Sequence, residues 1–160
     1  MFSPRIHRFE QTQILPVPLE EAWAFFSEPK NLDSMTPPEL AFDTQSGDDE
    51  AMFPGQVIVH RIQILPKIWT TWVTEIVETE ERSYFIDEQR FGPYKFWHHL
   101  HRFEACDEGT RMLDRVHYAL PFHPFSAPMN GLFIRPQLEH IFQFRRKVLE
   151  ERFRGSSLGG

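Results

Sequence analysis

The stretch Phe91–Leu120, FGPYKFWHHLHRFEACDEGTRMLDRVHYAL, decides how the rest of this sequence is interpreted. It predicts two antiparallel strands joined by a polar turn at ACDEGT. Side chains along a strand alternate between its two faces, so one face of the first strand carries Trp97, His99, His101 and Phe103. Two imidazoles between two large aromatic rings, on a face that we expect to be buried, indicate either a polar-lined pocket or a core whose polar groups pair internally.

The turn also predicts how the two strands are aligned. Residues that oppose one another share a face, and the expected pairs are Phe103–Met112, His101–Asp114, His99–Val116 and Trp97–Tyr118. The same reasoning across the FGPY turn places Asp87 near Trp97 and Phe85 beside His99. The predicted face therefore mixes aromatic rings with a His–Asp–Tyr set.

The flanking sequence predicts five further strands and three helices. Strand-like patterns cover residues 6–15, 40–45, 56–65, 68–79 and 83–89. Two short helices are expected between the first two strands, in PLEEAWAFFSEP and at residues 31–35. A long C-terminal helix starts at Pro136, or nearer Asn130, and its apolar stripe contains Leu138, Ile141, Phe142, Arg145, Val148, Leu149 and Phe153.

This order predicts an α+β helix-grip fold. A curved antiparallel sheet of about seven strands has one apolar face to cover, and the C-terminal helix is the element long enough to cover it. A sheet curved around one helix leaves space between them, and such space favours a ligand cavity. We expect a single domain over residues 1–154 and a flexible tail over residues 155–160.

Composition excludes several classes of function. The chain has 160 residues, 14% aromatic content and a net charge of −6, which disfavours nucleic acid as a partner. The basic group Arg145, Arg146, Lys147, Arg152 and Arg154 is interpreted as complementing the dipole of the last helix. One cysteine, Cys106, suits a reducing cytoplasm, and no apolar run is long enough for a membrane span. We expect a monomer or a homodimer.

The order of elements resembles the helix-grip fold of START domains and birch-pollen-allergen-like proteins. FIDEQRFGPYKFWHHLHRFE and LDRVHYALPF resemble the SRPBCC superfamily of ligand-binding and polyketide-cyclase-like domains. Together with PLEEAWAFFSEPKNLDSMTPP, they more narrowly resemble the domain beside sugar-epimerase-like domains in proteins named as cell-division inhibitors. The resemblance covers about residues 4–153. It implies the helix-grip fold. It also implies membership of a superfamily that includes lipid carriers, hormone receptors and aromatase/cyclases and shares no universal catalytic motif.

Three functions are compatible with these residues. The first is binding of an apolar small molecule or lipid between sheet and helix, by Trp72, Phe85, Asp87, Trp97, Phe103, Val116, Tyr118, Phe133, Leu138 and Phe142. The second is a cyclase, dehydratase or hydrolase in which His99, His101 and Asp114 act on a carbonyl compound, with Tyr118 donating to an enolate. The third is a protein-interaction domain that uses the apolar loop 120–133 and holds no ligand.

Two other interpretations of the histidines bear on these functions. A His–Asp set can simply satisfy itself in the core, and this is the commoner case. His99 and His101, with Asp87 or Asp114, also have a spacing that suits metal ligands. Because neither an HExxH motif nor a cysteine cluster is present, we predict no metal and no cofactor.

Overall fold

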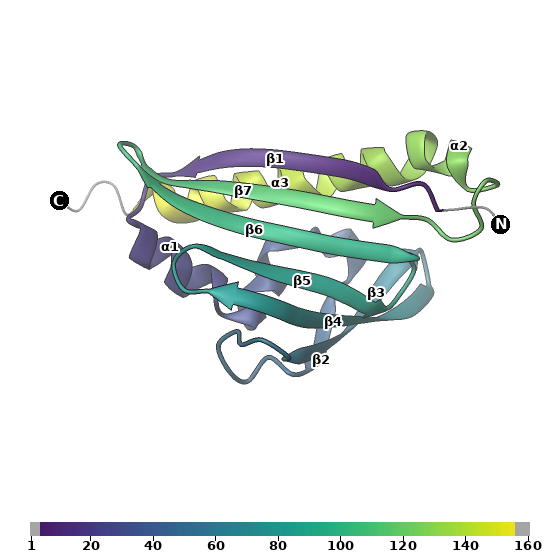
Figure 1. The fold of residues 1–160 in the computed structure, drawn as a ribbon, viewed down its shortest axis with the longest axis horizontal. Helices are drawn as coiled ribbons and strands as arrows, with labels where there is room; N and C mark the ends of the chain where they lie inside the picture. The colour runs from purple at the N-terminus through teal and green to yellow at the C-terminus, as the bar shows by residue number, and fades with distance from the viewer. Residues whose placement is uncertain (1–3, 156–160) are drawn as a thin grey trace.

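One antiparallel sheet organises residues 4–155, which the computed structural model describes. Its strand order is β1-β7-β6-β5-β4-β3-β2, so the first and last strands of the chain lie side by side (Figure 1). The strands are β1 (His7–Leu15), β2 (Asp43–Ser46), β3 (Val57–Leu65), β4 (Ile68–Glu80), β5 (Tyr84–Phe91), β6 (Phe96–Cys106) and β7 (Gly109–Ala119). The seven-stranded antiparallel sheet and the α+β helix-grip fold predicted from the sequence are confirmed.

The described residues form six helical segments, of which the last is long. They are α1 (Leu19–Phe26), the 3₁₀ turns η1 (Pro29–Met35) and η2 (Pro38–Leu40), α2 (Ala127–Met129), the π-helical η3 (Asn130–Ile134) and α3 (Arg135–Arg154). Glu20 and Glu21 occupy the first turn of α1, where the helix dipole favours acidic side chains. The two expected short helices are present, although the second is a 3₁₀ helix.

The predicted strand at residues 40–45 is wrong at its start. Pro38–Leu40 form the turn η2, and Ala41 then adopts a left-handed backbone with φ of 43°. The chain therefore pairs with β3 from Asp43 onward. The predicted boundary of a tail at residue 155 stays a prediction, because residues 156–160 lie outside the described range.

The two predicted strand alignments have different outcomes. Between β6 and β7, His101 lies opposite Asp114 and His99 opposite Val116, as expected. Between β5 and β6 the prediction is wrong by two residues, because Asp87 lies opposite His99 and Phe85 opposite His101. A shift of two keeps the same face of the strand, so Asp87 still points inward but stands beside the imidazoles instead of Trp97.

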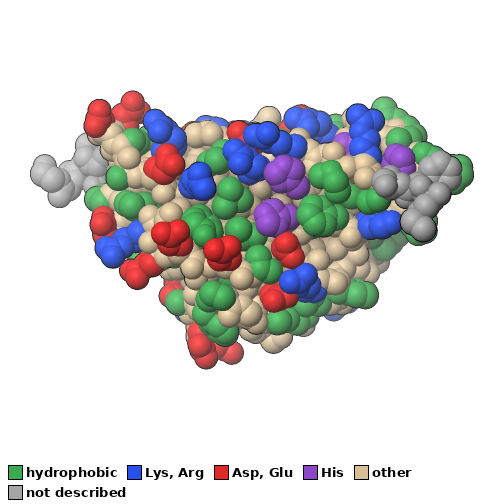
Figure 2. All heavy atoms as spheres, in the orientation of Figure 1, with side chains coloured by type: hydrophobic (Ala, Val, Ile, Leu, Met, Phe, Trp, Pro, Cys, Tyr) green, Lys and Arg blue, Asp and Glu red, His purple; other side chains and the backbone are tan. Residues whose placement is uncertain are grey.

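The outer face of the sheet is exposed and mixed in character. Figure 2 shows acidic and basic side chains interspersed with hydrophobic ones over β1, β7, β6, β5 and β4. His98 lies on this face and its Nδ1 is 2.9 Å from Glu88 Oε1. The covered face is the opposite one, against which α3 runs behind β1 and β7 (Figure 1).

Two apolar clusters separated by a polar layer lie between the sheet and α3. One contains Phe26, Phe103 and Leu149, and the other contains Trp97 and Phe142 among its members. Between them, α3 buries an arginine, Arg145, and β1 places two glutamines against the helix. The side-chain amides of Gln11 and Gln13 donate to the backbone oxygens of Phe142 and Arg146, over 3.2 and 3.0 Å. The helix is therefore held to the sheet by polar as well as apolar contacts. No helix of the described residues is long and apolar enough to cross a membrane.

Candidate ligand-binding site

A cavity of about 930 Å³ lies between α3 and the inner faces of β3, β4, β5 and β6. Its wall is mainly apolar, because the alternating pattern of β3 and β4 turns Ile58, Ile62 and Ile76 toward α3. Leu138 and Phe142 supply the helix side. The volume lies within the range of small-molecule sites in proteins, about 300–1,000 Å³.

The wall of the cavity contains most of the residues that the sequence indicated for it. These are Trp72, Phe85, Asp87, Trp97, His99, His101, Phe133, Leu138 and Phe142. They come from three strands, α3 and the segment before it, so the curvature of the sheet brings together residues far apart in sequence.

Four indicated residues do not border the cavity. Phe103 packs against the rings of Trp23 and Phe26, and Val116 is fully buried in the other apolar cluster. The hydroxyl of Tyr118 donates to Asn130 Oδ1 over 2.7 Å, which directs it away from any enolate in the cavity. Asp114 is buried behind the histidines.

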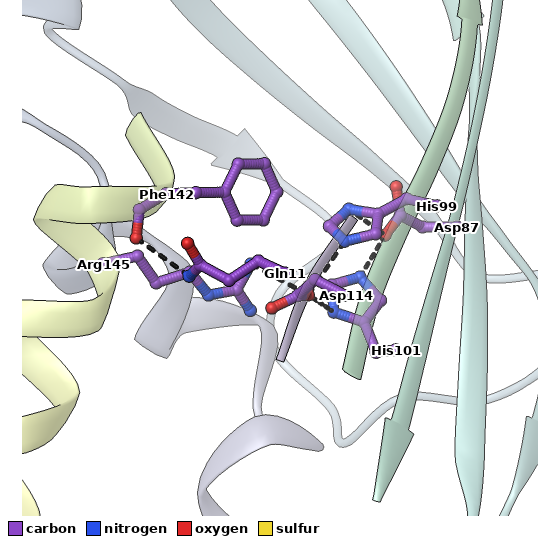
Figure 3. A network of polar contacts seen from close by, with 7 residues as sticks. All are labelled: Gln11, Asp87, His99, His101, Asp114, Phe142 and Arg145. Carbon is purple, nitrogen blue, oxygen red and sulfur yellow. Dashed lines mark hydrogen bonds and ion pairs between the residues drawn. The ribbon is translucent and has the colours of Figure 1, made fainter. Parts of the chain in front are cut away.

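The centre of the site is a polar cluster of Asp87, His99, His101, Asp114 and Arg145 (Figure 3). Asp114 Oδ1 accepts from His99 Nε2 at 2.9 Å and lies 3.1 Å from His101 Nδ1. On the other side, Asp87 Oδ2 lies 2.7 Å from His101 Nε2 and 3.7 Å from His99 Nδ1. The two imidazoles stack with centroids 3.7 Å apart. Each carboxylate thus faces one nitrogen of each ring.

Arg145 was assigned to the helix dipole from the sequence, and that assignment is wrong. The residue is 5% exposed, and its Nη1 lies 3.5 Å from Asp114 Oδ1. Its guanidinium also lies 5.6 and 5.8 Å from the ring centres of Phe26 and Phe142. Arg145 is therefore the buried counter-ion of the cluster, not a solvated helix-end charge.

The pKa values of the cluster are shifted in opposite directions. Burial raises the pKa of Asp114, but Arg145 and the two histidines outweigh burial and hold it well below its usual value. Burial and the neighbouring His101 lower the pKa of His99, which therefore stays a neutral imidazole. Burial also lowers the pKa of His101, but its two carboxylate partners reverse this and raise it overall. Burial raises the pKa of Asp87, but His101 and His99 outweigh burial and lower it overall. These directions favour two charged carboxylates facing a charged His101 and Arg145.

His60 is a cavity residue whose position the sequence did not indicate. It lies on the inner face of β3 between Ile58 and Ile62, and it is buried against the ring of Phe42. Its Nδ1 lies 3.0 Å from Thr44 Oγ1, which donates to Asp33 Oδ1. Burial lowers the pKa of His60 to about 4. The alternation of Ile58, His60 and Ile62 was the available signal.

The rim of the cavity is apolar and exposed. Phe122 and Phe125, before α2, are 82% and 86% exposed and still border the cavity, as does Leu65 at the end of β3. The predicted apolar loop 120–133 therefore lies at the cavity mouth.

This architecture defines a class: a curved sheet closed by one long helix around an apolar cavity, the helix-grip arrangement. Within that class, the chain belongs to the polyketide cyclase/dehydrase and lipid transport family, whose model matches residues 7–154. No curated protein sequence matches it.

Solved structures share the fold at low sequence identity. TTHA0849 from Thermus thermophilus superposes with a TM-score of 0.68 at 17% identity, over 96% of this chain and 99% of that one. Ara h 8.0201 gives 0.59 at 15% identity, over 92% and 99%. StfQ, the di-domain ARO/CYC of the steffimycin biosynthetic pathway, gives 0.70 at 12% identity, over 97% of this chain and 52% of StfQ. The chain is thus about half as long as StfQ.

Proposed function

We propose that this protein binds an apolar small molecule or lipid with one polar end in the cavity beneath α3. The observation that carries the proposal is the distribution of charge in the cavity wall. Its acidic, basic and histidine side chains are Glu28, His60, Asp87, His99, His101 and Arg145, and four of these six belong to the polar cluster. An apolar wall with a few convergent polar groups is the usual construction of a ligand site.

The apolar wall supplies the affinity in this proposal, and the polar cluster supplies the orientation. Burying apolar surface is worth about 25 cal/mol per Å², whereas a ligand oxygen placed at the cluster would meet His99 and His101. The family description includes lipid transport, and StfQ is named as an ARO/CYC of a biosynthetic pathway, so an amphipathic ligand is compatible with both.

A cavity-filling substitution tests this proposal. Ile58→Trp, on the inner face of β3, is expected to weaken binding of dodecanoic acid at least tenfold, because the indole would occupy ligand space. Binding is followed by quenching of the fluorescence of Trp72 and Trp97, which border the cavity, and by native mass spectrometry. Val57→Trp is the matched control, since Val57 neighbours Ile58 but is exposed on the other face. Equal binding by the two variants, or none by the wild type, would contradict the proposal.

A second candidate function is proton transfer at a carbonyl compound, as in aldol cyclisation or dehydration. The observation that favours it is a neutral imidazole, His99, that borders the cavity and is oriented by Asp114 through its Nε2. His99 Nδ1 would then act as the base, with His101 as the acid. Tyr118 drops out of this mechanism, because its hydroxyl is engaged by Asn130.

The enzyme proposal predicts loss of proton transfer without loss of fold. His101→Gln is expected to abolish any acceleration by the protein of deuterium exchange at the α-carbon of a β-diketone probe, measured by NMR. The variant should stay folded at the assay temperature, although losing a positive charge that faces two aspartates lowers its melting temperature. A variant that is unfolded at the assay temperature would mean that the cluster is structural. An unchanged exchange rate in a well-folded His101→Gln would exclude the acid role.

Narrower assignments follow the sequence alone. The kinship with the domain of proteins named as cell-division inhibitors is proposed on PLEEAWAFFSEPKNLDSMTPP and the WxHxHxFE strand, and a cytoplasmic location on the single cysteine. An interaction role for residues 120–133 is less favoured than a role at the cavity mouth, because Phe122 and Phe125 border the cavity.

A further inference from the structure

We propose that Asp87, His99 and His101 form a site for a divalent transition-metal ion in the wall of the cavity. One ligand atom from each residue can be chosen so that all three lie within 4.8 Å of one another. Two imidazole nitrogens and one carboxylate oxygen suit zinc, cobalt, nickel or iron, whereas magnesium and calcium prefer oxygen ligands throughout. The proposal does not depend on an apolar ligand being bound.

The geometry around Asp87 needs only a small adjustment to hold an ion. Bonds from zinc to nitrogen or oxygen are about 2.0–2.2 Å long, so ligand atoms around one ion stand roughly 3–3.5 Å apart. Asp87 Oδ2 lies 3.7 Å from His99 Nδ1 and 2.7 Å from His101 Nε2. An ion would replace the proton between His101 and Asp87 as that pair opens by several tenths of an ångström.

Asp114 supplies the outer contacts that metal-binding histidines usually have. In most metal sites the second ring nitrogen of a ligating histidine is held by a carboxylate or carbonyl, which fixes the ring. Here Asp114 Oδ1 lies 2.9 Å from His99 Nε2 and 3.1 Å from His101 Nδ1, so both rings turn their remaining nitrogens toward Asp87. Figure 3 shows the two stacked rings with one aspartate on either side.

The charges and the surroundings also fit. Arg145 Nη1 lies 3.5 Å from Asp114, on the side of the cluster away from Asp87. Two aspartates, one arginine and a divalent ion leave one positive charge, which a single anionic ligand would neutralise. Asp87, His99 and His101 all border the cavity, so the coordination positions not taken by protein face it. Three protein ligands with an open position are the arrangement of catalytic zinc sites.

The prediction of no metal rests on the absence of an HExxH motif and of a cysteine cluster. The sequence leaves Asp87 or Asp114 as the third ligand, and the expected alignment places Asp87 near Trp97. In the structure Asp87 lies directly opposite His99. A third ligand therefore comes from the neighbouring strand, which no local sequence motif would reveal.

Cobalt titration of the chelator-treated full chain tests the site. We expect one Co²⁺ per chain, with visible d–d absorption of a nitrogen- and oxygen-ligated ion, and at least tenfold weaker binding by Asp87→Asn. Asp114→Asn is expected to weaken binding by about 10–100-fold through the lost outer contact. His98→Gln is the matched control, because His98 neighbours His99 but lies on the outer face beside Glu88. Its affinity should equal that of the wild type.

Two outcomes would overturn the proposal. One is a wild type that takes up no Co²⁺, and the other is a signal lost in His98→Gln but kept in Asp87→Asn. If Asp87→Asn does not fold, X-ray absorption spectroscopy of the Zn²⁺-loaded wild type tests the site instead. Fewer than two imidazole ligands on the zinc ion would also overturn the proposal. These measurements use metal alone, so failure of dodecanoic acid to bind would leave their result unaffected.

Discussion

Replacing Arg145 with methionine is expected to lower the free energy of unfolding by about 3–5 kcal/mol. Removing one partner of a buried ion pair leaves the other charge uncompensated, which costs about this much. Asp114 is buried, and Arg145 is the strongest of the partners that lower its pKa. Without the guanidinium, Asp114 must either stay charged against its desolvation cost or take up a proton. Methionine keeps most of the aliphatic volume, so little of the loss comes from a cavity.

Equilibrium urea unfolding of the variant gives this number. Lys147→Met, on the exposed face of α3 two residues away, is the matched control and should stay within about 0.5 kcal/mol of the wild type. The double variant Arg145→Met with Asp114→Asn should recover part of the loss, because the charge left behind is removed too. An Arg145→Met protein as stable as Lys147→Met would mean that the pair is solvated in solution.

The polar cluster forms one layer of the core, and this layer aligns α3 with the sheet. Along β7, Met112 and Val116 flank Asp114, and along α3, Phe142 and Leu149 flank Arg145. The polar layer therefore interrupts both apolar stripes at matching heights. Pairing it internally fixes which turn of α3 faces which residue of the sheet, since any slip would bury an unpaired charge.

How much of the strand alignment could be predicted from the sequence depended on the turns. Between β6 and β7 a two-residue turn, Asp107–Glu108, leads into Gly109, and so short a turn fixes the register. Between β5 and β6, the side-chain amide of Gln89 bonds both backbone groups of Tyr94. Gly92 adopts φ of 155°, and a Cβ at this position would clash with the side chain of Gln89. The paired ladder ends at Glu88 and His98, so the connection is longer than the FGPY turn suggested, and Asp87 lies opposite His99 instead of Trp97.

Part of the candidate site could be predicted from the sequence. His99, His101 and Asp114 were predicted to share the inward face from the alternation of side chains along the strands. This prediction was right because the strand pattern and the position of the β6–β7 turn were both correct. Arg145 appeared in the apolar stripe of α3, yet basic residues near a helix end have an ordinary solvated explanation, and only the packed sheet shows that its charge meets Asp114. The depth of the cavity at His60 also depends on sheet curvature, which strand patterns do not encode.

Between pH 7 and pH 4, His60 is expected to cost the wild type about 3 kcal/mol of its free energy of unfolding. The variant His60→Asn should be spared this loss. Burial lowers the pKa of His60 from 6.5 to about 4 in the folded protein, whereas the unfolded chain titrates near 6.5. Between these values the unfolded state binds the extra proton, so the free energy of unfolding falls as the pH falls through this window. Below pH 4 both states are protonated and this contribution stops changing. Asp87 and Asp48 attract the charged form, but burial outweighs them.

Urea unfolding at half-unit pH steps from 7.5 to 3.5 measures the effect as a difference between variant and wild type, which cancels most other titrating groups. Asparagine keeps a donor near the position of Nδ1, facing Thr44 Oγ1, so the contact that leads to Asp33 is retained. His140→Asn, at an exposed position of α3 beside Glu39, is the matched control and should stay within about 0.5 kcal/mol of the wild-type curve, because exposed ion pairs contribute little. Parallel curves for His60→Asn and the wild type would show that His60 takes up its proton at the same pH folded and unfolded. The cavity around it would then have to be filled with water, not with an apolar ligand.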